Sequence, residues 1–405
     1  TVSTRVKTYS TSGNYIFNGT QPQSTGGLPS TSTANVIIDN AAGVTLDGSK
    51  VINTPGSLLV KGILNFGTAT VPYNITGTGS FTAKTGSTLV ITTSAGINPA
   101  GVNSGSMRLT GTRVFENNVN YNFSKDDLSA NQLKSQLGTS FGSEITSINN
   151  LIINNARGVS DTVTNSPSIT INGQLIFTSG HFYKKSNKVI LAEGASISRS
   201  STSGWLIGSL QKNIATGSSN TTYEVGTDSL NYTPISVSFN NVSNAGSLAA
   251  SPVVAAHPNI IGSSISSTKR LNFYASLSSN DIAFDNYSAT INFAASNILN
   301  GAAYANFLSA KFDGSSWTSA AIASRTSTSV QLNGLSSLGD IQIGESCNNT
   351  STETITACDT YTWHGTTFTT SNNTATWLGT NADGCDSLVT LNLTIVTSTS
   401  SPVVV

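Results

Sequence analysis

The amino-acid sequence predicts an all-β protein, and three observations support that fold class. First, only 9% of the residues are charged, against about 25% in an average soluble domain, so polarity comes mainly from Ser, Thr, Asn and Gly. Thr and the β-branched aliphatic residues favour strands, while Asn and Gly favour turns. Second, the chain is 37% hydrophobic, with 15 Phe, 11 Tyr and 4 Trp, which is enough apolar surface to form a core.

The third observation is a ten-residue segment that occurs twice, as NVIIDNAAGV at residues 35–44 and as NLIINNARGV at residues 150–159. Repetition of an apolar run, an Asn corner and a glycine turn is typical of stacked repeats, which bury their apolar faces against one another. Several neighbouring runs are apolar at consecutive positions, as in strands covered on both faces. We therefore predict a parallel β-helix (solenoid) with two related repeat blocks over residues 1–199.

One stretch inside this region has a helical pattern. Residues 125–137 follow Ser124, a residue type that caps helix N-termini, and carry Asp126 and Asp127 in the first turn. Leucines recur at positions 128, 133 and 137. We expect a single helix there, lying on the solenoid.

The pattern changes near residue 200. From there to residue 346, apolar and polar residues alternate in short runs, as at residues 235–239 and 288–293. Turn residues separate these runs at the spacing of an antiparallel sandwich. The sequence therefore predicts an immunoglobulin-like β-sandwich over residues 200–346.

All three cysteines lie in the last segment, residues 347–396. About 50 residues form a marginal core, and small extracellular modules are commonly stapled by disulfides. Cys358 and Cys385 bracket the aromatic runs of the segment, so we predict a disulfide between them in a small β-module. Cys347 then pairs elsewhere or remains free. Residues 397–405 resemble a linker, and we expect the chain to be part of a longer protein.

Composition argues against several classes of partner. The formal net charge is zero, so we expect no basic surface for nucleic acid. No apolar run approaches the roughly 20 residues that a membrane-spanning helix needs. The first residues lack the pattern of a secretory signal peptide, and we expect that any such peptide has been removed.

The sequence also argues against an enzyme. Residues 138–142 match the G-x-S-x-G pattern of a hydrolase nucleophile, but the helical stretch precedes them instead of following, and no later His is placed for a triad. Carboxylates of the predicted solenoid are scattered among unlike repeats, whereas glycosidases need two close together. Spacings typical of zinc or calcium ligands are missing from the cysteine module and its neighbour. We predict no catalytic residues, no metal and no cofactor.

Exposed aromatic residues could stack on sugar rings, which keeps a carbohydrate-binding module open as an alternative. The aromatic residues considered are Trp205, Trp317, Tyr361, Trp363 and Trp377. In so small a module, Tyr361 and Trp363 are better interpreted as core.

Two long motifs of the last module carry a family resemblance. The segments ACDTYTWHGTTF (357–368) and GTNADGCDSLVTLNLTI (379–395) closely resemble a repeat found in tandem in very large surface proteins of Bacteroidota. These include the gliding-motility adhesins exported by the type IX secretion system. The motifs cover about an eighth of the chain. Residues 232–237, 284–289 and 335–340 resemble a domain that neighbours this repeat, and the NAAGV segments resemble repeats in the same proteins.

The resemblance implies an extracellular, cell-surface protein that mediates attachment, and that acts in gliding in some members. Its implied partners are surface polysaccharides or abiotic surfaces, together with secretion and gliding machinery contacted through other parts of the chain. Proteins of this phylum are O-glycosylated after Asp, at Ser or Thr followed by an apolar residue. The matching acceptors here are Thr162, Ser229 and Ser387.

Three hypotheses for function follow. The first is a structural, adhesive segment of a secreted surface filament. The second is a carbohydrate-binding module of a secreted protein. The third, and the least favoured, is a polysaccharide-degrading β-helix enzyme, a class that the architecture alone brings into consideration.

Overall fold

The computed structural model describes residues 9–125, 135–141, 143–161, 166–381 and 385–398, and the structural statements below refer to these residues. Strands dominate, and the described helices are two short 3-10 turns, η1 (Ala295–Asn297) and η2 (Tyr304–Asn306). The all-β prediction is confirmed. The helix predicted at residues 125–137 falls mostly outside the described residues, and its last part contains a short strand, β15 (Ser135–Gln136).

Chain contacts divide the protein into two compact units. The first comprises residues 1–253 and 276–292, and the second comprises residues 254–275 and 293–405.

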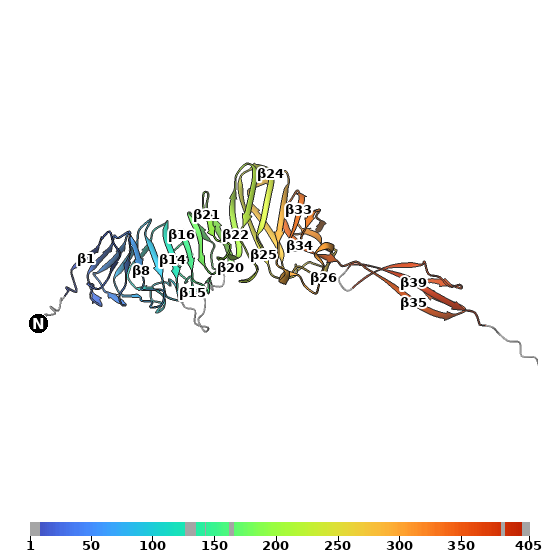
Figure 1. The fold of residues 1–405 in the computed structure, drawn as a ribbon, viewed down its shortest axis with the longest axis horizontal. Coiled ribbons are helices and arrows are strands. Elements are labelled where there is room, and N and C mark those ends of the chain that lie inside the picture. Colours follow the sequence, from blue (N-terminus) through green and yellow to red (C-terminus); the bar gives the residue numbers. More distant parts are fainter. Residues whose placement is uncertain (1–8, 126–134, 142, 162–165, 382–384, 399–405) are drawn as a thin grey trace, which may run out of the picture. The chain divides into compact units, whose positions relative to one another are not determined.

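The N-terminal part of the first unit consists of parallel sheets whose strands follow one another along the chain (Figure 1). One sheet contains β1 (Asn14–Phe17), β4 (Asn35–Ile38), β7 (Ser57–Val60), β10 (Ser80–Ala83) and β13 (Arg113–Phe115). A second contains β3 (Thr31–Ser32), β6 (Lys50–Ile52), β9 (Ile75–Gly77) and β12 (Met107–Leu109). Each repeat of the chain contributes one strand to each of these sheets. The inward side chains of successive strands therefore stack in columns.

A third run of parallel pairs extends further along the chain. It contains β2 (Gln23–Ser24), β5 (Val44–Thr45), β8 (Ile63–Asn65), β11 (Thr88–Ile91), β14 (Val119–Ser124), β16 (Ser147–Asn154), β19 (Gln174–Ser179) and β21 (Ser196–Arg199). Parallel pairs beside it link β15, β17 (Val159–Asp161), β18 (Ile169–Ile171), β20 (Phe182–Leu191) and β22 (Leu206–Ile214).

A column of fully buried side chains shows how these strands form a core. Strand register aligns one residue from each of five successive strands, namely Leu64, Leu89, Tyr121, Leu151 and Leu175. Side chains alternate between the two faces of a strand, so every second residue enters this core. Burial of one such side chain contributes roughly 1.5–3 kcal/mol.

The repeated segment adopts the same corner in both copies. Asn40 and Asn155 are buried, and their side-chain oxygens accept hydrogen bonds from the backbone N–H groups two residues later, at 2.7 and 2.9 Å. The glycines that follow, Gly43 and Gly158, have φ angles of 100° and 87°, which favour glycine because it lacks a Cβ. Asn and Gly are therefore repeated because the turn needs them.

The rest of the first unit is antiparallel. Strand β24 (Ile235–Asn244) pairs with β23 (Gly217–Tyr223), β28 (Ala283–Phe284) and β29 (Tyr287–Asn292). Strand β22 pairs in parallel with β20 and antiparallel with β25 (Gly246–Val253). This strand therefore marks the change from parallel to antiparallel pairing.

The second unit is built around an antiparallel strand, β34 (Gly339–Ser346). It pairs with β26 (Ile265–Arg270) and β30 (Leu308–Phe312), and β30 pairs with β31 (Trp317–Ser319). Strands β32 (Ile322–Arg325) and β33 (Ser329–Leu335) form a further antiparallel pair. Strand β27 (Tyr274–Asn280) contains residues of both units.

The C-terminal module contains a three-stranded sheet and a hairpin. The central strand β39 (Asp386–Val396) pairs in parallel with β35 (Asn349–Cys358) and antiparallel with β38 (Thr376–Thr380). The hairpin comprises β36 (Tyr361–Trp363) and β37 (Thr366–Phe368). Trp363, Leu391 and Leu393 form the buried core of the module, and Tyr361 packs against it. The interpretation of Tyr361 and Trp363 as core residues is confirmed.

The predicted Cys358–Cys385 disulfide is wrong. Cys385 is bonded to Cys347, with Cα atoms 5.9 Å apart, and Cys358 is free and exposed. Because β35 and β39 are parallel, Cys347 and Cys385 precede the same end of the paired strands, whereas Cys358 lies beside Val396 at the other end. About eleven residues of extended chain, roughly 35 Å, separate these two ends.

Candidate functional site

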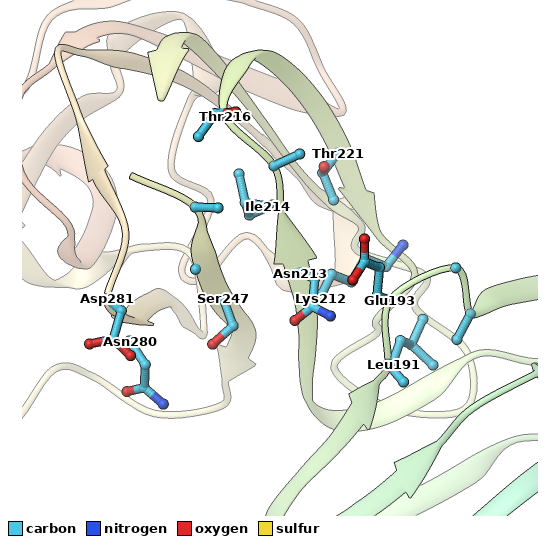
Figure 2. A pocket seen from close by; sticks show the side chains of 16 residues that line it. Leu191, Glu193, Lys212, Asn213, Ile214, Thr216, Thr221, Ser247, Asn280 and Asp281 are labelled. Carbon is cyan, nitrogen blue, oxygen red and sulfur yellow. The ribbon is translucent and has the colours of Figure 1, made fainter. Parts of the chain in front are cut away.

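A groove of about 640 Å³ lies in the first unit, beside the change from parallel to antiparallel pairing. Its walls and floor come from the loop after β20, the end of β22 with the turn that follows it, and Thr221 within β23. The turn into β25, the end of β27 and the residue after β27 complete the lining. Polar residues of the lining include Glu193, Lys212, Asn213, Ser247, Asn280 and Asp281. Figure 2 shows Glu193 and Asp281 on opposite sides of the strand that carries Lys212.

Strand pairing and a close backbone approach shape this groove. Asn213 pairs with Ser247 across β22 and β25 and forms part of the floor. A Cβ on Gly246 would lie 2.3 Å from the carbonyl oxygen of Asn280, so only glycine allows the wall to approach the floor this closely. Asp281 adopts a φ of 62°, and its carbonyl oxygen accepts a hydrogen bond from Asn244. The close backbone approach at Gly246 and the side-chain amide of Asn244 therefore hold the wall in place.

The groove has a negative character because its lysine is already neutralised. The Lys212 ammonium forms an ion pair with Glu224 at 2.8 Å and donates a hydrogen bond to the carbonyl oxygen of Thr222 at 2.5 Å. The carboxylates of Glu193 and Asp281 are exposed and have no ion-pair partner within the described chain. Two free carboxylates repel anionic ligands and can accept hydrogen bonds from hydroxyl or amino groups.

The size and lining of the groove determine what it can hold. A volume of about 640 Å³ is within the usual range for small-molecule sites, roughly 300–1,000 Å³. None of the described residues lining the groove is aromatic or a histidine. The described residues also contain no group of three or more His, Cys, Asp or Glu side chains able to hold a metal ion.

The predicted glycosylation acceptors occupy different environments. Ser229 is exposed in a bend, and the next residue, Leu230, is 86% exposed. The carboxylate of Asp228 accepts hydrogen bonds from the backbone N–H groups of Leu230 and Asn231 at 2.7 and 2.9 Å, which fixes this bend. Ser387 is half-buried in β39. The structure therefore makes Ser229 the more accessible of the two.

The third predicted acceptor, Thr162, lies outside the described residues. The residue before it, Asp161, is buried and forms an ion pair with Lys184 at 2.7 Å. Lys184 also donates hydrogen bonds to Ser166 and to the carbonyl oxygen of Ser186, the latter at 2.6 Å. Because this buried ammonium is surrounded by oxygen partners, removing it would leave Asp161 buried and uncompensated, so we interpret the pair as structural.

The tryptophans considered for sugar stacking have protein partners. Trp205 donates its indole N–H to the carbonyl oxygen of Asp228 at 2.8 Å, and Trp317 donates to that of Asn259 at 2.5 Å. Trp377 is 40% exposed and stacks against His364, with ring centroids 3.9 Å apart. The stacked His364 ring therefore covers one face of the Trp377 indole.

The G-x-S-x-G match does not form a nucleophile site. Ser140 is buried and donates a hydrogen bond to Glu144 at 2.6 Å, and Glu144 forms an ion pair with Arg113 at 3.0 Å. A serine activated for attack needs a base such as histidine instead of a salt-bridged carboxylate. Gly142, the last residue of the match, lies outside the described residues.

His257 is also explained by packing. Its Nδ1 accepts the backbone N–H of Asn259 at 3.1 Å, which leaves Nε2 as the donor to Asp340 at 3.2 Å. The rings of Tyr274, Phe312 and Trp317 surround it, with centroids 4.8–5.0 Å away. This histidine is a core residue of the second unit.

Comparison of the chain with protein-family models, with curated proteins and with solved structures finds no match. Within the described residues, no helix is long and apolar enough to cross a membrane.

Proposed function

We propose that this chain is a structural, adhesive segment of a large secreted cell-surface protein, with attachment as its function and gliding motility as the process it can serve. In this proposal the stacked parallel sheets form a β-helix, the antiparallel strands form an immunoglobulin-like sandwich, and residues 347–396 form a disulfide-stapled adhesin repeat. The resemblance of the last module to gliding adhesins is one support. The structural support is the outer face of the first parallel sheet.

On that outer face, polar side chains of successive strands form hydrogen bonds with one another. Asn35 donates a hydrogen bond to Asn14 at 3.2 Å and accepts one from Ser57 at 2.9 Å. A parallel column of charges is paired in the same way, Lys61 with Asp39 at 3.4 Å and Lys84 with Glu116. Exposed pairs of this kind add little stability, but they leave a neutral surface. Many copies can therefore lie close together without repulsion.

The cysteine chemistry supports an extracellular location. The Cys347–Cys385 disulfide is of a kind that persists in oxidising compartments and is rare in the cytosol.

Labelling of live cells with an antibody against this segment tests the proposal. Signal on the surface of intact cells, removed by external protease, is the expected result. Signal confined to the medium would contradict a surface-attached segment. Filming the labelled cells would show whether the signal moves during gliding.

The groove favours one alternative, a carbohydrate-binding module. Its two exposed carboxylates, Glu193 and Asp281, suit the hydroxyl groups of a neutral glycan and disfavour sulfated or uronic polysaccharides. A glycan array would test this, with the double variant Glu193→Gln/Asp281→Asn expected to lose the binding. Asp39→Asn, which removes an exposed carboxylate that does not line the groove, is the matched control.

A further inference from the structure

We infer that the open edge of β35 is a strand-pairing surface, and that its partner is the β35 strand of a second copy of this chain. The inference goes beyond the proposed function, because strand pairing requires neither a glycan nor a cell surface. It rests on the direction of the backbone groups of β35, on its composition, and on its self-complementarity.

The backbone hydrogen bonds of β35 leave one edge unused. Within the described chain, β35 pairs only with β39, in unbroken parallel register over ten residues. The N–H of Asp359, just after β35, donates to the carbonyl oxygen of Val396 at 3.0 Å. Backbone groups in a strand alternate in direction, so the odd-numbered residues face β39. The N–H and C=O groups of Thr352, Thr354 and Thr356 therefore face the open edge.

This edge lacks the features that usually prevent strand addition. Natural edge strands are kept short, or carry Pro, Lys or a β-bulge. Strand β35 is ten residues long and contains neither Pro nor Lys, and its pairing with β39 has no bulge. Its one charged residue, Glu353, accepts the indole N–H of Trp363 at 2.8 Å. This hydrogen bond holds the Glu353 side chain against the tryptophan of the module's own core.

Unpaired backbone N–H and C=O groups along the edge of β35 require an extended strand as their partner. A second copy of β35 can supply it, because two such strands can pair about a two-fold axis. In an antiparallel pair centred on Thr354, that residue lies opposite its own copy, and Thr352 lies opposite Thr356. Each of these residues directs its N–H and C=O toward the partner, as the hydrogen-bonded pairs of an antiparallel ladder require. Threonine pairs across strands are favourable. The product is a two-fold symmetric sheet of six strands, an isologous interface.

The free thiol of Cys358 does not link the two copies in this arrangement. In the same register, Cys358 lies opposite Thr350 of the second copy, and the two thiols lie at opposite ends of the strand pair. Four residues on each side of Thr354 separate them, which is roughly 27 Å of strand. The association should therefore not depend on oxidation of this thiol.

Sedimentation of the full chain tests the inference. Between about 1 μM and 1 mM protein, with and without reductant at a level that spares the Cys347–Cys385 bond, the mass should rise from 41.8 kDa toward twice that value. Thr354→Pro removes the outward N–H, leaves the backbone hydrogen bonds to β39 in place, and should weaken association at least roughly tenfold. The hydrogen bond that the Thr354 hydroxyl accepts from the Asn392 side chain at 3.4 Å is lost equally in the proline variant and in the valine control. Thr354→Val retains the N–H and is the matched control.

Amide hydrogen exchange of the unmodified chain provides a second readout that does not depend on folding of the proline variant. The N–H groups of Thr352, Thr354 and Thr356 should exchange rapidly in dilute protein and become protected as the concentration rises. A monomer throughout the concentration range would overturn the inference. So would a dimer that survives Thr354→Pro, a dimer that reductant dissociates, or exchange that is independent of concentration.

Discussion

Two buried tyrosines predict opposite effects of the same chemical change, removal of one hydroxyl group. Tyr121 and Tyr223 are both fully buried in the first unit. The Tyr223 hydroxyl donates a hydrogen bond to the carbonyl oxygen of Leu248 at 3.0 Å. The Tyr121 hydroxyl has no hydrogen-bond partner in the described chain, and its ring packs edge-on against Phe141. Burial raises the pKa of both phenols, so neither ionises near neutral pH.

The expected magnitudes follow from these environments. Tyr121→Phe removes a polar group that is buried without compensation, and should raise the free energy of unfolding by about 1–2 kcal/mol. Tyr223→Phe removes the hydroxyl that donates to the carbonyl oxygen of Leu248, so that this carbonyl loses a hydrogen bond. The free energy of unfolding should fall by about 1 kcal/mol. The two variants should therefore differ by about 2–3 kcal/mol.

Urea unfolding of the two variants and the parent, followed by a probe in the first unit, measures this difference. Because both residues belong to that unit, the same transition reports both changes. An unchanged slope of free energy against urea would show that the unfolded states are comparable. A loss of more than about 1 kcal/mol in Tyr121→Phe would refute the reasoning, since it would mean that this hydroxyl makes a stabilising bond.

Three further changes test other parts of the structure. Lys184→Met should lower the free energy of unfolding by about 3–5 kcal/mol, because it leaves the Asp161 carboxylate buried without its partner. Chemical denaturation measures this change. A loss below about 1 kcal/mol would contradict it and would show that water reaches the pair. Cys385→Ser opens a disulfide loop with a sequence separation of 38 and should destabilise the C-terminal module by about 4 kcal/mol in the chain-entropy model; proteolysis of that module would accelerate. Gly246→Ala forces the groove wall outward and should cost about 1–3 kcal/mol, whereas Gly48→Ala, with no heavy atom within 4 Å of the new Cβ, should be nearly neutral by the same assay.

The all-β class could be predicted because local preferences and packing agree. Asn40 and Asn155 recur in the sequence since each forms the same hydrogen-bonded corner, followed by a glycine with positive φ. Patterns of this kind need no knowledge of distant contacts. The repeated segment was therefore a reliable signal for repeated local structure.

The disulfide and the groove could not be predicted in the same way. Pairing of Cys385 with Cys347 depends on the parallel direction of β35 and β39, and alternation of apolar residues is the same for parallel and antiparallel strands. The groove combines Glu193, Ser247 and Asp281, which are far apart in the sequence. One local signal was available, a glycine at position 246 beside an Asn-rich turn, but nothing in the sequence shows which backbone it approaches.

The position of the disulfide determines how the C-terminal module would carry tension. A pulling force that enters the chain at Cys347 and leaves it after Val396 passes through the sulfur bridge to Cys385 and then along β39. The intervening residues, including all of β35 and the hairpin, are bypassed by this covalent route. Stretching would then extend one strand that is already nearly straight. The module would therefore transmit load with little increase in its end-to-end length, even if its small core unfolded.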